Sequence, residues 1–405
     1  MKRKILFLSQ MYPYPPDGGG KIKTLNTIKT LAKEFEIYAI FVSEEQPSKK
    51  ELCELEKLGI KIKVFYSDRI LASVKDDYPN LLRKFLIGIP HYVFQYSHPE
   101  AANYIQEVIN NFKPDIIHID HLNIAQYLPK EKDQIWILEH HNVEAYLYWT
   151  RLLHSRKLTR KLYLLIEMIL TYLYEWKTLP LLDHIFTISE IESKRTQKLF
   201  GVKKVSAQPF VYPVLTMKRR DNIKPYILFI GNLGWPPNED AVEWFLKQIL
   251  PDITKQVPNV EFHVVGKRQP DYEKHWPKPK NLFLHGYQKS LTPFLRNARV
   301  FVMPFRMGGG MRIKSLTALA SGLPIITTPL GVEGLHVIDK QEVLIAKTEK
   351  EFAKLVAEAL NSKQLRNKLS NNASQYIQKN HGSSLNNLFL KKYDAVVTNN
   401  LAMKP

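Results

Sequence analysis

The chain has 405 residues, of which 44% are hydrophobic, and it carries 58 Lys and Arg against 39 Asp and Glu. This length predicts two or three domains, and the hydrophobic content excludes an intrinsically disordered protein. Cys53 is the sole cysteine, which excludes a disulfide framework. The net charge of +19 fits nucleic acid, anionic lipid or phosphorylated small molecules as partners.

No stretch of the sequence is typical of a segment that crosses or is exported through a membrane. The apolar run near the N-terminus stops after residue 8, which is too short for a signal peptide. The apolar stretch 162–174 is interrupted by Glu167 and falls short of the roughly 20 residues that a spanning helix needs. We therefore expect a cytoplasmic protein that is soluble or lies at most on the inner face of the membrane.

The first half of the chain alternates short apolar runs with helical spacing. Residues 5–9 form the first run, a Pro/Gly-rich turn follows, and apolar residues then recur with helical spacing over 21–33. Continuous apolar runs of this length are typical of strands buried on both faces of a parallel sheet. The further strands predicted in this half are 37–42, 62–66, 116–119, 135–138 and 185–188.

A second series of the same kind begins after residue 225. Its predicted helices are 240–249 and 313–320, and its predicted strands are 226–230, 261–265, 281–285, 300–304 and 324–328. The chain is thus predicted to be α/β, with two doubly wound halves. They join at 208–224, where prolines and a charged run interrupt both patterns.

The positive charge is divided unevenly between the halves. Residues 1–210 hold 30 basic and 24 acidic side chains, whereas residues 211–405 hold 28 and 15. The second half is therefore expected to prefer anions, although solvated helix faces would account for the same surplus.

Three glycines, Gly18, Gly19 and Gly20, lie between the first predicted strand and helix. Glycines let the backbone approach a ligand closely, and the helix that follows offers free N–H groups to an anion. The spacing excludes a Walker loop, because Ile22 follows Lys21, and a dinucleotide fingerprint, because Lys23 occupies the third glycine's place. An acceptor or phosphate loop and a plain tight turn remain as interpretations.

A second polar motif, 139–144, follows the strand 135–138 and contains His140 and His141 between Glu139 and Glu144. It lacks the spacing of familiar metal sites, so a metal is not expected. A histidine at the carboxyl end of a strand can act as a base or hold a substrate hydroxyl. We expect one of the two histidines to have only a structural role.

The third motif is the richest in groups that bind anions. A predicted strand runs into Gly308, Gly309 and Gly310, and a helix begins next with Arg312 and Lys314 in its first turns. Backbone amides, the positive end of a helix and two cations at one place suit a diphosphate. The alternative is a flexible loop before an ordinary helix.

These motifs resemble those of the family 4 retaining glycosyltransferases, and the chain is most similar to the bacterial polysaccharide sugar transferases among them. The resemblance extends over nearly the whole chain and is most specific over 308–335. The segments that carry it are 229–238, 264–266, 285–287, 302–304, 308–314, 322–328 and 331–335 in the second half, and 15–19, 114–118 and 139–142 in the first.

The resemblance implies a GT-B architecture, with two Rossmann-like domains, 1–210 on the acceptor side and 211–380 on the donor side, facing a cleft. Residues 381–405 would return to the first domain as a helix, with its pattern over 384–397. His141, Arg312 and Lys314 would be the catalytic residues, His141 near the transferred sugar and the two cations at the donor diphosphate. The donor-binding residues would be Gly231, Asn232, Gly308, Gly309, Gly310, Met311, Thr317 and Glu333, the last at the nucleotide ribose.

The sequence departs from the family pattern at Thr317, where the family usually has a glutamate. A threonine can form hydrogen bonds but supplies no charge. The expected function is a metal-independent retaining glycosyltransferase, which moves a sugar from a nucleotide-diphosphate sugar to a glycan or lipid-linked saccharide in polysaccharide biosynthesis. The alternative is a catalytically impaired relative that binds a glycan or a partner protein.

Residues 147–176 combine aromatic and apolar residues with Arg151, Arg156, Lys157, Arg160 and Lys161. Such a pair of basic amphipathic helices can lie on an anionic membrane, or it can pack on the first domain with a solvated basic face. Nucleic acid is not expected as a partner, because the basic residues belong to no recognition motif.

Overall fold

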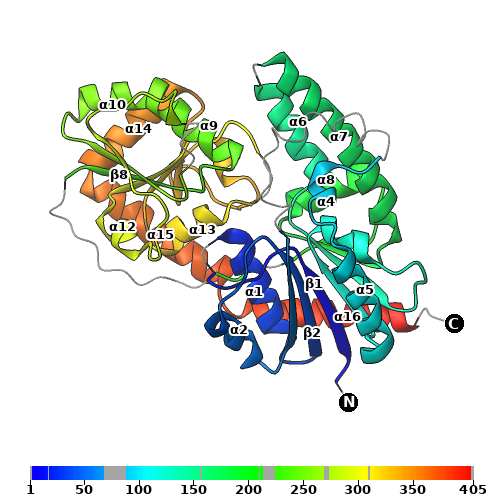
Figure 1. Ribbon diagram of the computed structural model, residues 1–405. Helices are drawn as coiled ribbons and strands as arrows, with labels where there is room; N and C mark the ends of the chain where they lie inside the picture. Colours follow the sequence, from blue (N-terminus) through cyan, green and yellow to red (C-terminus); the bar gives the residue numbers. More distant parts are fainter. Residues whose placement is uncertain are drawn as a thin grey trace. The chain divides into compact units, whose positions relative to one another are not determined.

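A computed structural model describes residues 2–16, 18–67, 88–155, 157–208, 210–212, 224–268, 273–308 and 311–402 (Figure 1). The chain divides into two compact units, the first formed by 1–210 together with 384–405 and the second by 211–383. Among the described residues, none of the helices combines the length and the apolar character needed to cross a bilayer.

The first unit is built on a parallel sheet of seven strands in the order β3-β2-β1-β4-β5-β6-β7. Its register brings Ser9 of β1 opposite Asp120 of β4, and Asp120 opposite Glu139 of β5, so three polar residues meet at the carboxyl ends of adjacent strands. The strands are β1 (Lys4–Ser9), β2 (Glu36–Ser43), β3 (Lys61–Tyr66), β4 (Ile116–Asp120), β5 (Ile135–His140), β6 (His184–Thr187) and β7 (Val205–Ala207).

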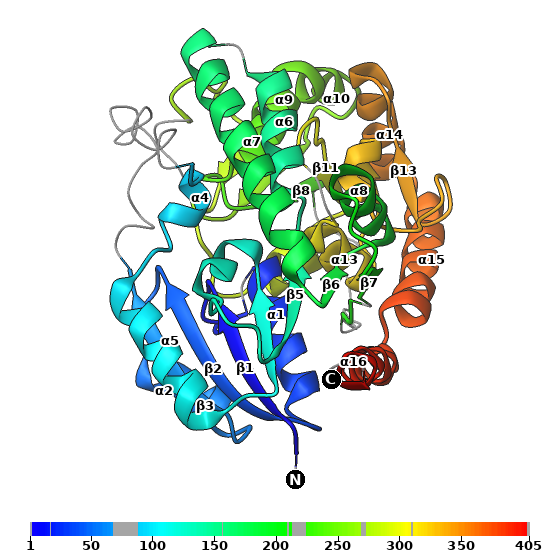
Figure 2. The same cartoon turned by 90° about the vertical axis from the view of Figure 1, so that its right-hand side faces the viewer.

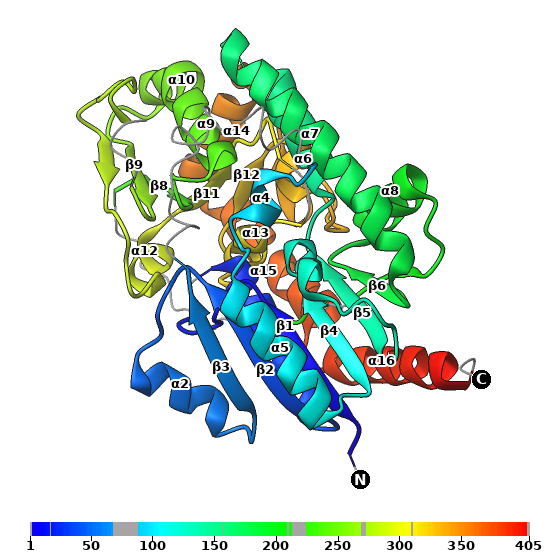
Figure 3. The same cartoon turned by 45° about the vertical axis from the view of Figure 1, so that its right-hand side comes forward.

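Helices cover both faces of this sheet, as two separate apolar clusters indicate. Figure 2 and Figure 3 show that α6 and α7 form a long pair which projects beyond the carboxyl edge of the sheet. The helices are α1 (Gly19–Leu31), α2 (Lys49–Glu56), α4 (His91–Phe94), α5 (Pro99–Phe112), η3 (Leu122–Tyr127), α6 (Glu144–His154), α7 (Leu158–Thr178), η4 (Leu179–Leu181), α8 (Glu190–Phe200) and α16 (Leu385–Ala402).

The last helix, α16, packs on the first unit, as the resemblance implied. Phe389, Tyr393 and Val397 recur at intervals of four residues and are buried in the same cluster as β1 and β2. Arg3 pairs with Asp394 at 2.7 Å, which adds a polar contact at the rim. The end of the chain therefore completes the core of the unit in which the chain begins.

The second unit repeats this topology with six parallel strands in the order β10-β9-β8-β11-β12-β13. The strands are β8 (Tyr226–Ile230), β9 (Glu261–Val265), β10 (Leu282–Leu284), β11 (Val300–Met303), β12 (Ile325–Thr327) and β13 (Val343–Ile345). The helices are α9 (Pro236–Trp244), η5 (Phe245–Ile249), α10 (Leu250–Gln256), α12 (Thr292–Asn297), α13 (Ile313–Ala320), η6 (Pro329–Val332), α14 (Glu349–Asn361) and α15 (Lys363–His381).

The two parallel sheets with their helices confirm the predicted fold class, whereas two details differ from the sequence analysis. The helix predicted over 240–249 begins earlier, at Pro236, and passes through the π-helical turn η5 into α10. The short strands β7 and β13 were not predicted. Each has three residues; β10 and β12, which were predicted, are equally short, so length alone does not explain the difference.

Candidate functional site

In both sheets the chain order reverses beside the first strand, between β1 and β4 in one unit and between β8 and β11 in the other. The carboxyl ends of strands at such a reversal are where open α/β sheets bind ligands. In each unit, the predicted site residues follow these strands at the carboxyl edge of the sheet.

In the first unit, Asp120, His121 and His141 form a compact buried cluster. Oδ1 of Asp120 lies 2.7 Å from Nε2 of His141 and 3.3 Å from Nδ1 of His121. The two imidazole rings stack, with their centroids 3.6 Å apart. Asp120 ends β4, while His141 directly follows β5, so neighbouring strands bring them together across 21 residues.

The three groups of the cluster shift one another's pKa values. Burial alone would raise the pKa of Asp120, but His121 and His141 hold it well below its usual range. Asp120 in turn outweighs the effect of burial on His121 and raises the pKa of that imidazole. Burial, with the charge of His121, lowers the pKa of His141. A carboxylate can only accept, so Nε2 of neutral His141 donates, which leaves Nδ1 as an acceptor.

Hydroxyl groups from two other elements fix the carboxylate of Asp120. Ser9 at the end of β1 and Thr24 in α1 each donate a hydrogen bond of 2.7 Å to Oδ2. With Oδ1 facing the histidines, both oxygens of this buried group are satisfied, which rigid positioning of a side chain requires. Neither Ser9 nor Asp120 stood out in the sequence, and only the strand register could have indicated them.

Beneath this cluster, Lys23 and Glu139 form a buried ion pair with an N···O distance of 2.5 Å. Thr27 donates to Oε2 of Glu139 at 2.9 Å, and the ring of Phe389 lies under the ammonium of Lys23. Lys23 therefore takes part in the packing of α1 on the sheet, and its charge is neutralised within the fold.

The three glycines of the first loop occupy the start of α1. Gly18 precedes the helix in an extended conformation, and a Cβ added there would meet nothing within 4 Å. A Cβ at Gly20 would lie 3.0 Å from the flexible end of Met11. No acidic residue occurs in the first turn, so the free N–H groups of Gly19 and Gly20 remain electropositive. A side chain would therefore fit at position 18, so lack of space does not explain why this residue is a glycine.

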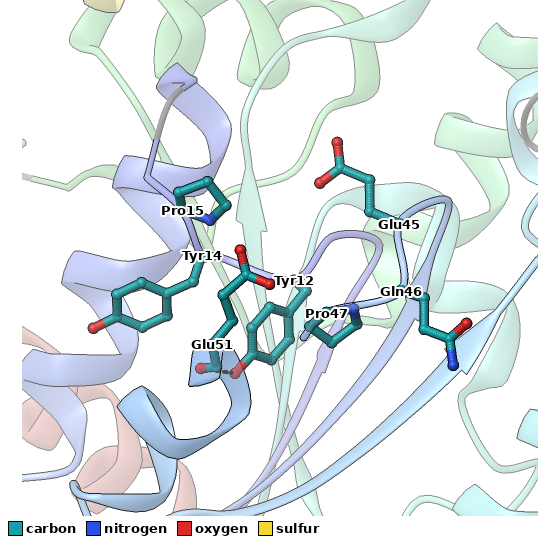
Figure 4. Close-up of a pocket in the computed structure, with 7 residues that line it drawn as sticks. All are labelled: Tyr12, Tyr14, Pro15, Glu45, Gln46, Pro47 and Glu51. Atoms are coloured by element: carbon teal, nitrogen blue, oxygen red, sulfur yellow. Dashed lines mark hydrogen bonds between the residues drawn. The ribbon is translucent and has the colours of Figure 1, made fainter. Parts of the chain in front are cut away.

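A pocket lies beside this loop, as Figure 4 shows. Its lining includes the carboxylates of Glu45 and Glu51. Tyr12 also lines it, and its hydroxyl donates a hydrogen bond of 2.8 Å to the backbone oxygen of Glu51. Two carboxylates repel a phosphate. The pocket contains none of the predicted site residues; Tyr14, Pro15, Gln46 and Pro47 complete its lining.

Among the described residues, one group of side chains has the composition and spacing of a metal site. Asp120, His121 and His141 offer one donor atom each, all within 4.8 Å of one another. Two imidazoles and one carboxylate are ligands that zinc and similar divalent ions accept. The same geometry also serves as a hydrogen-bonded triad, so the cluster admits both interpretations.

In the second unit, Arg312 is buried at the start of α13. Its guanidinium donates to the backbone oxygens of Met307 at 3.2 Å and Leu330 at 3.3 Å, and it stacks on the ring of Phe305 at 4.2 Å. Burial lowers the pKa of Arg312 to about 10, an effect that the negative charge of half-buried Glu333 opposes. Within the described residues no carboxylate lies in ion-pair distance of this guanidinium.

Lys314 lies two residues further along, with its ammonium held by Asn238 and placed over the rings of Phe229 and Phe305 at 5.0 and 4.9 Å. Burial, together with the charge of Arg312, lowers the pKa of Lys314 well below its usual range. Glu333 is the acidic residue whose charge acts on Arg312, and two neighbouring buried cations with one such partner among the described residues remain costly unless a further anion joins them.

Glycines at two positions make room for these cations. A Cβ at Gly231, after β8, would lie 2.9 Å from Nζ of Lys314 and 2.8 Å from the side chain of Asn238. Gly308 has a φ of +109°, and a Cβ there would lie 2.9 Å from a guanidinium nitrogen of Arg312. Any larger residue at Gly231 would therefore displace the lysine.

The other predicted donor residues have varied surroundings. Met311 is buried, and Asn232 is exposed with Oδ1 accepting from the N–H of Gly234 at 2.9 Å, so that this amide stabilises its own loop. Gly309 and Gly310 lie outside the described residues. Asn238, which the sequence analysis gave no role, orients Lys314 from α9, and its spacing of 76 residues from the lysine carries no signal in the sequence.

Thr317 is hydrogen-bonded on two sides. Its Oγ1 lies 2.7 Å from the hydroxyl of Tyr212 and donates to the backbone oxygen of Ile313 at 3.2 Å. Tyr212 is buried, and its backbone N–H donates to the backbone oxygen of His381 at the end of α15. The position at which the family usually has a glutamate is thus occupied by a threonine–tyrosine pair.

Comparison with known proteins identifies the second unit. Residues 224–362, which contain Arg312, Lys314 and Glu333, match the family described as glycosyl transferases group 1. Over these residues the chain is similar to that family. The resemblance inferred from the sequence is thereby confirmed for this segment, and Arg312 and Lys314 lie within it.

Relatives that align with nearly the whole chain agree with this result. An uncharacterized 44.6 kDa protein in the cps region of Klebsiella pneumoniae is 23% identical over 396 residues, which cover 94% of this chain and 97% of that protein. Sucrose-phosphate synthase from Thermosynechococcus elongatus is 13% identical, with a TM-score of 0.70 over 98% of this chain and 100% of that one. HepE from Anabaena, solved with UDP and glucose, is 12% identical, with a TM-score of 0.65 over 97% and 100%. The fold of this chain is therefore GT-B.

Proposed function

We propose that this chain is a retaining glycosyltransferase, which transfers a sugar from a nucleotide-diphosphate sugar to a glycan or a lipid-linked saccharide in polysaccharide biosynthesis. One observation carries the proposal: Arg312 and Lys314 are two buried or half-buried cations, held by backbone oxygens and an amide at the carboxyl edge of a parallel sheet. A diphosphate supplies the anion that this arrangement lacks.

The same two cations would carry the chemistry at the donor. Negative charge develops on the diphosphate as the glycosidic bond breaks, and fixed cations at that place lower the barrier. Because the α13 cations neutralise the leaving group, we propose a reaction that needs no metal. Glu333 is assigned to the nucleotide ribose, a role which rests on the family resemblance.

His141 is assigned to the transferred sugar, again by resemblance, and the geometry of the first unit gives it a means of acting. With Nε2 bound to Asp120, the Nδ1 atom is free to accept a hydrogen bond from a sugar hydroxyl. The ring of His121, whose pKa Asp120 raises, stacks beside it and would favour a negatively charged group nearby when it is protonated.

Calorimetry with nucleoside diphosphates tests the donor site. UDP is the first ligand to try, because HepE was solved with UDP. Arg312→Gln and Lys314→Met should each weaken binding by about tenfold to a hundredfold, since a hydrogen bond to a charged group contributes about 1.5–3 kcal/mol. Arg306→Gln is the matched control. Arg306 follows β11, the strand that also precedes the loop before Arg312, but it already pairs with Asp240.

Donor hydrolysis tests the activity itself. The purified protein should release the nucleoside diphosphate slowly from one member of a panel of nucleotide sugars, and a suitable acceptor should accelerate the release. Absence of binding and of release across the whole panel would refute the assignment as an enzyme. A cytoplasmic location stays a prediction from the sequence.

A second candidate function is a binding protein with impaired catalysis, and Thr317 is the observation that favours it. Its contact with Tyr212 leaves no carboxylate at this position. Thr317→Glu separates the two candidates: a gain in turnover indicates a chain that has lost activity, whereas a loss indicates a working site built around threonine and tyrosine. Thr317→Val, which keeps the size and removes the hydroxyl, is the control.

A further inference from the structure

Helix α7 turns an apolar face away from the first unit. Six large residues recur along it at intervals of three or four and form what we call the α7 outer face. They are Leu158, Leu162, Leu165, Ile169, Leu173 and Trp176, with exposed fractions of 82, 59, 38, 40, 41 and 54%. Figure 2 and Figure 3 show this helix running alongside α6. A soluble monomer seldom exposes so continuous an apolar strip.

The acidic residues of α7 face the opposite way. Glu167 is 1% exposed and accepts from the backbone N–H of His91 at 2.9 Å, at the start of α4. Glu175 is fully buried and accepts from the N–H groups of Glu144 and Ala145, at the start of α6. Both carboxylates therefore cap neighbouring helices. As a result, α7 presents no acidic side chain on its outer face.

Basic residues occur at both ends of the α7 outer face. Lys157 and Lys161 are exposed beside Leu158 and Leu162, and Lys177 is exposed after Trp176. Within the described residues, neither Lys157 nor Lys161 lies in ion-pair distance of a carboxylate. Cations at a helix N-terminus oppose the macrodipole, and no side chain caps this end. These lysines therefore do not stabilise the helix, and binding of an external anion accounts for their placement.

The three arginines that the sequence analysis considered for a membrane surface do not extend this pattern. Arg151 is half-buried with its guanidinium over the ring of Tyr148 at 5.2 Å, and so belongs to the packing of α6 on α7. Arg156 lies outside the described residues. Arg160 is half-buried. The lysines at the two ends of α7 are thus the exposed cations of this helix.

We propose that the α7 outer face is a docking surface for an anionic lipid membrane, on which α7 lies parallel to the bilayer plane. Its apolar side chains would enter the interface, while the lysines would meet the lipid phosphates. The helix is about 30 Å long at 1.5 Å per residue, so the contact would be extended. Self-association through this face is less favourable, since antiparallel copies would place Lys157 and Lys161 against Lys177.

Co-sedimentation with vesicles tests the proposal on the full chain. The protein should pellet with phosphatidylcholine vesicles that contain phosphatidylglycerol and much less with phosphatidylcholine alone. Leu158→Glu combined with Leu162→Glu should lower partitioning by at least about tenfold, because two exposed leucines no longer enter the lipid. Lys157→Gln combined with Lys161→Gln should lower it by about tenfold and weaken its dependence on salt.

Leu388→Glu is the matched control, because Leu388 is 44% exposed on α16, away from this helix. It should pellet as the unchanged protein does, and unchanged melting temperatures should show that all variants fold. Failure to pellet with anionic vesicles would overturn the proposal. A dimer in light scattering, broken by the leucine variant and without lipid binding, would assign the face to a second copy and overturn it equally.

Lipid binding does not depend on the donor chemistry. The role we assign to the surface, which is to bring the enzyme to a lipid-linked acceptor, rests on the proposed function. Calorimetry with UDP on the leucine variant separates the two proposals, because retained nucleotide affinity with lost pelleting supports both. If the unchanged protein pellets with anionic vesicles but binds no nucleotide, the membrane proposal stands and the transferase proposal is refuted.

Discussion

Nε2 of His141 lies 2.7 Å from Oδ1 of Asp120, although 21 residues separate them in the chain. This contact, with the stacked ring of His121, concentrates three titratable groups at the carboxyl edge of the first sheet. A buried carboxylate that serves two imidazoles polarises both, so each should titrate abnormally.

Asp120→Asn should reverse these shifts. Without the carboxylate, burial should lower the pKa of His121, which Asp120 now raises. NMR titration of the ring nitrogens should show the pKa of His121 above its ordinary value in the unchanged protein and below it in the variant. Turnover should fall by about 10²-fold or more if the hydrogen-bonded pair of Asp120 and His141 acts on the sugar. Ser43→Ala, at the end of another strand of the same sheet, is the control.

Glu144 should make the protein less stable as the pH rises. Burial, with the charge of Glu175, raises the pKa of Glu144 to about 7. The folded state therefore binds more protons than the unfolded state between about pH 4.3 and 7, and stability decreases across this window. Glu144→Gln should raise the melting temperature at pH 8 and change it little at pH 4, as calorimetry would measure. Equal effects at both values would contradict the shifted pKa.

Diphosphate binding should take up protons at Lys314. Burial and Arg312 hold its pKa well below the usual range in the free site, and a bound diphosphate would raise it again. Affinity should therefore be greatest at low pH and decrease as the pH rises through the pKa of the free site. Calorimetry in buffers of different ionisation enthalpy measures the proton uptake. Lys314→Met should abolish it, and an identical uptake in that variant would assign it elsewhere.

Gly231→Ala should weaken nucleotide binding without unfolding the protein. The new methyl group would lie 2.9 Å from Nζ of Lys314, so the ammonium must move. We expect a loss of about tenfold in affinity, the size of one charge-assisted hydrogen bond. Gly18→Ala is the control, because a Cβ there meets nothing within 4 Å. Equal losses in both variants would show that Lys314 is not the cause.

Chelation by EDTA should leave turnover unchanged, because the two cations of α13 are proposed to neutralise the donor diphosphate. The cluster of Asp120, His121 and His141 makes this a sharp test, since its donor atoms lie within 4.8 Å of one another. A loss of activity in EDTA that zinc restores, and that His121→Gln makes permanent, would assign a metal to that cluster.

The sequence by itself determined the alternation of strands and helices, the two doubly wound halves and the loops that follow β1, β5, β8 and β11. Apolar runs of about four to six residues are typical of strands whose two faces are both buried, so their order indicates a parallel sheet. It also indicated Arg312 and Lys314, because cations and glycines stand together in the chain.

Only the tertiary structure decided which distant groups meet. The register of β1, β4 and β5 brings Ser9 and Asp120 to His141, and the packing of α9 brings Asn238 to Lys314. Such contacts depend on strand order, which local patterns do not contain.

Helix α7 shows the same limit. Both of its faces carry apolar residues, so periodicity could not reveal that Glu167 and Glu175 point inward to cap other helices while the leucines point outward. Hydrogen bonds to the free N–H groups at helix ends outweigh the usual preference of carboxylates for water. These hydrogen bonds join different helices, so the pattern within α7 does not reveal them.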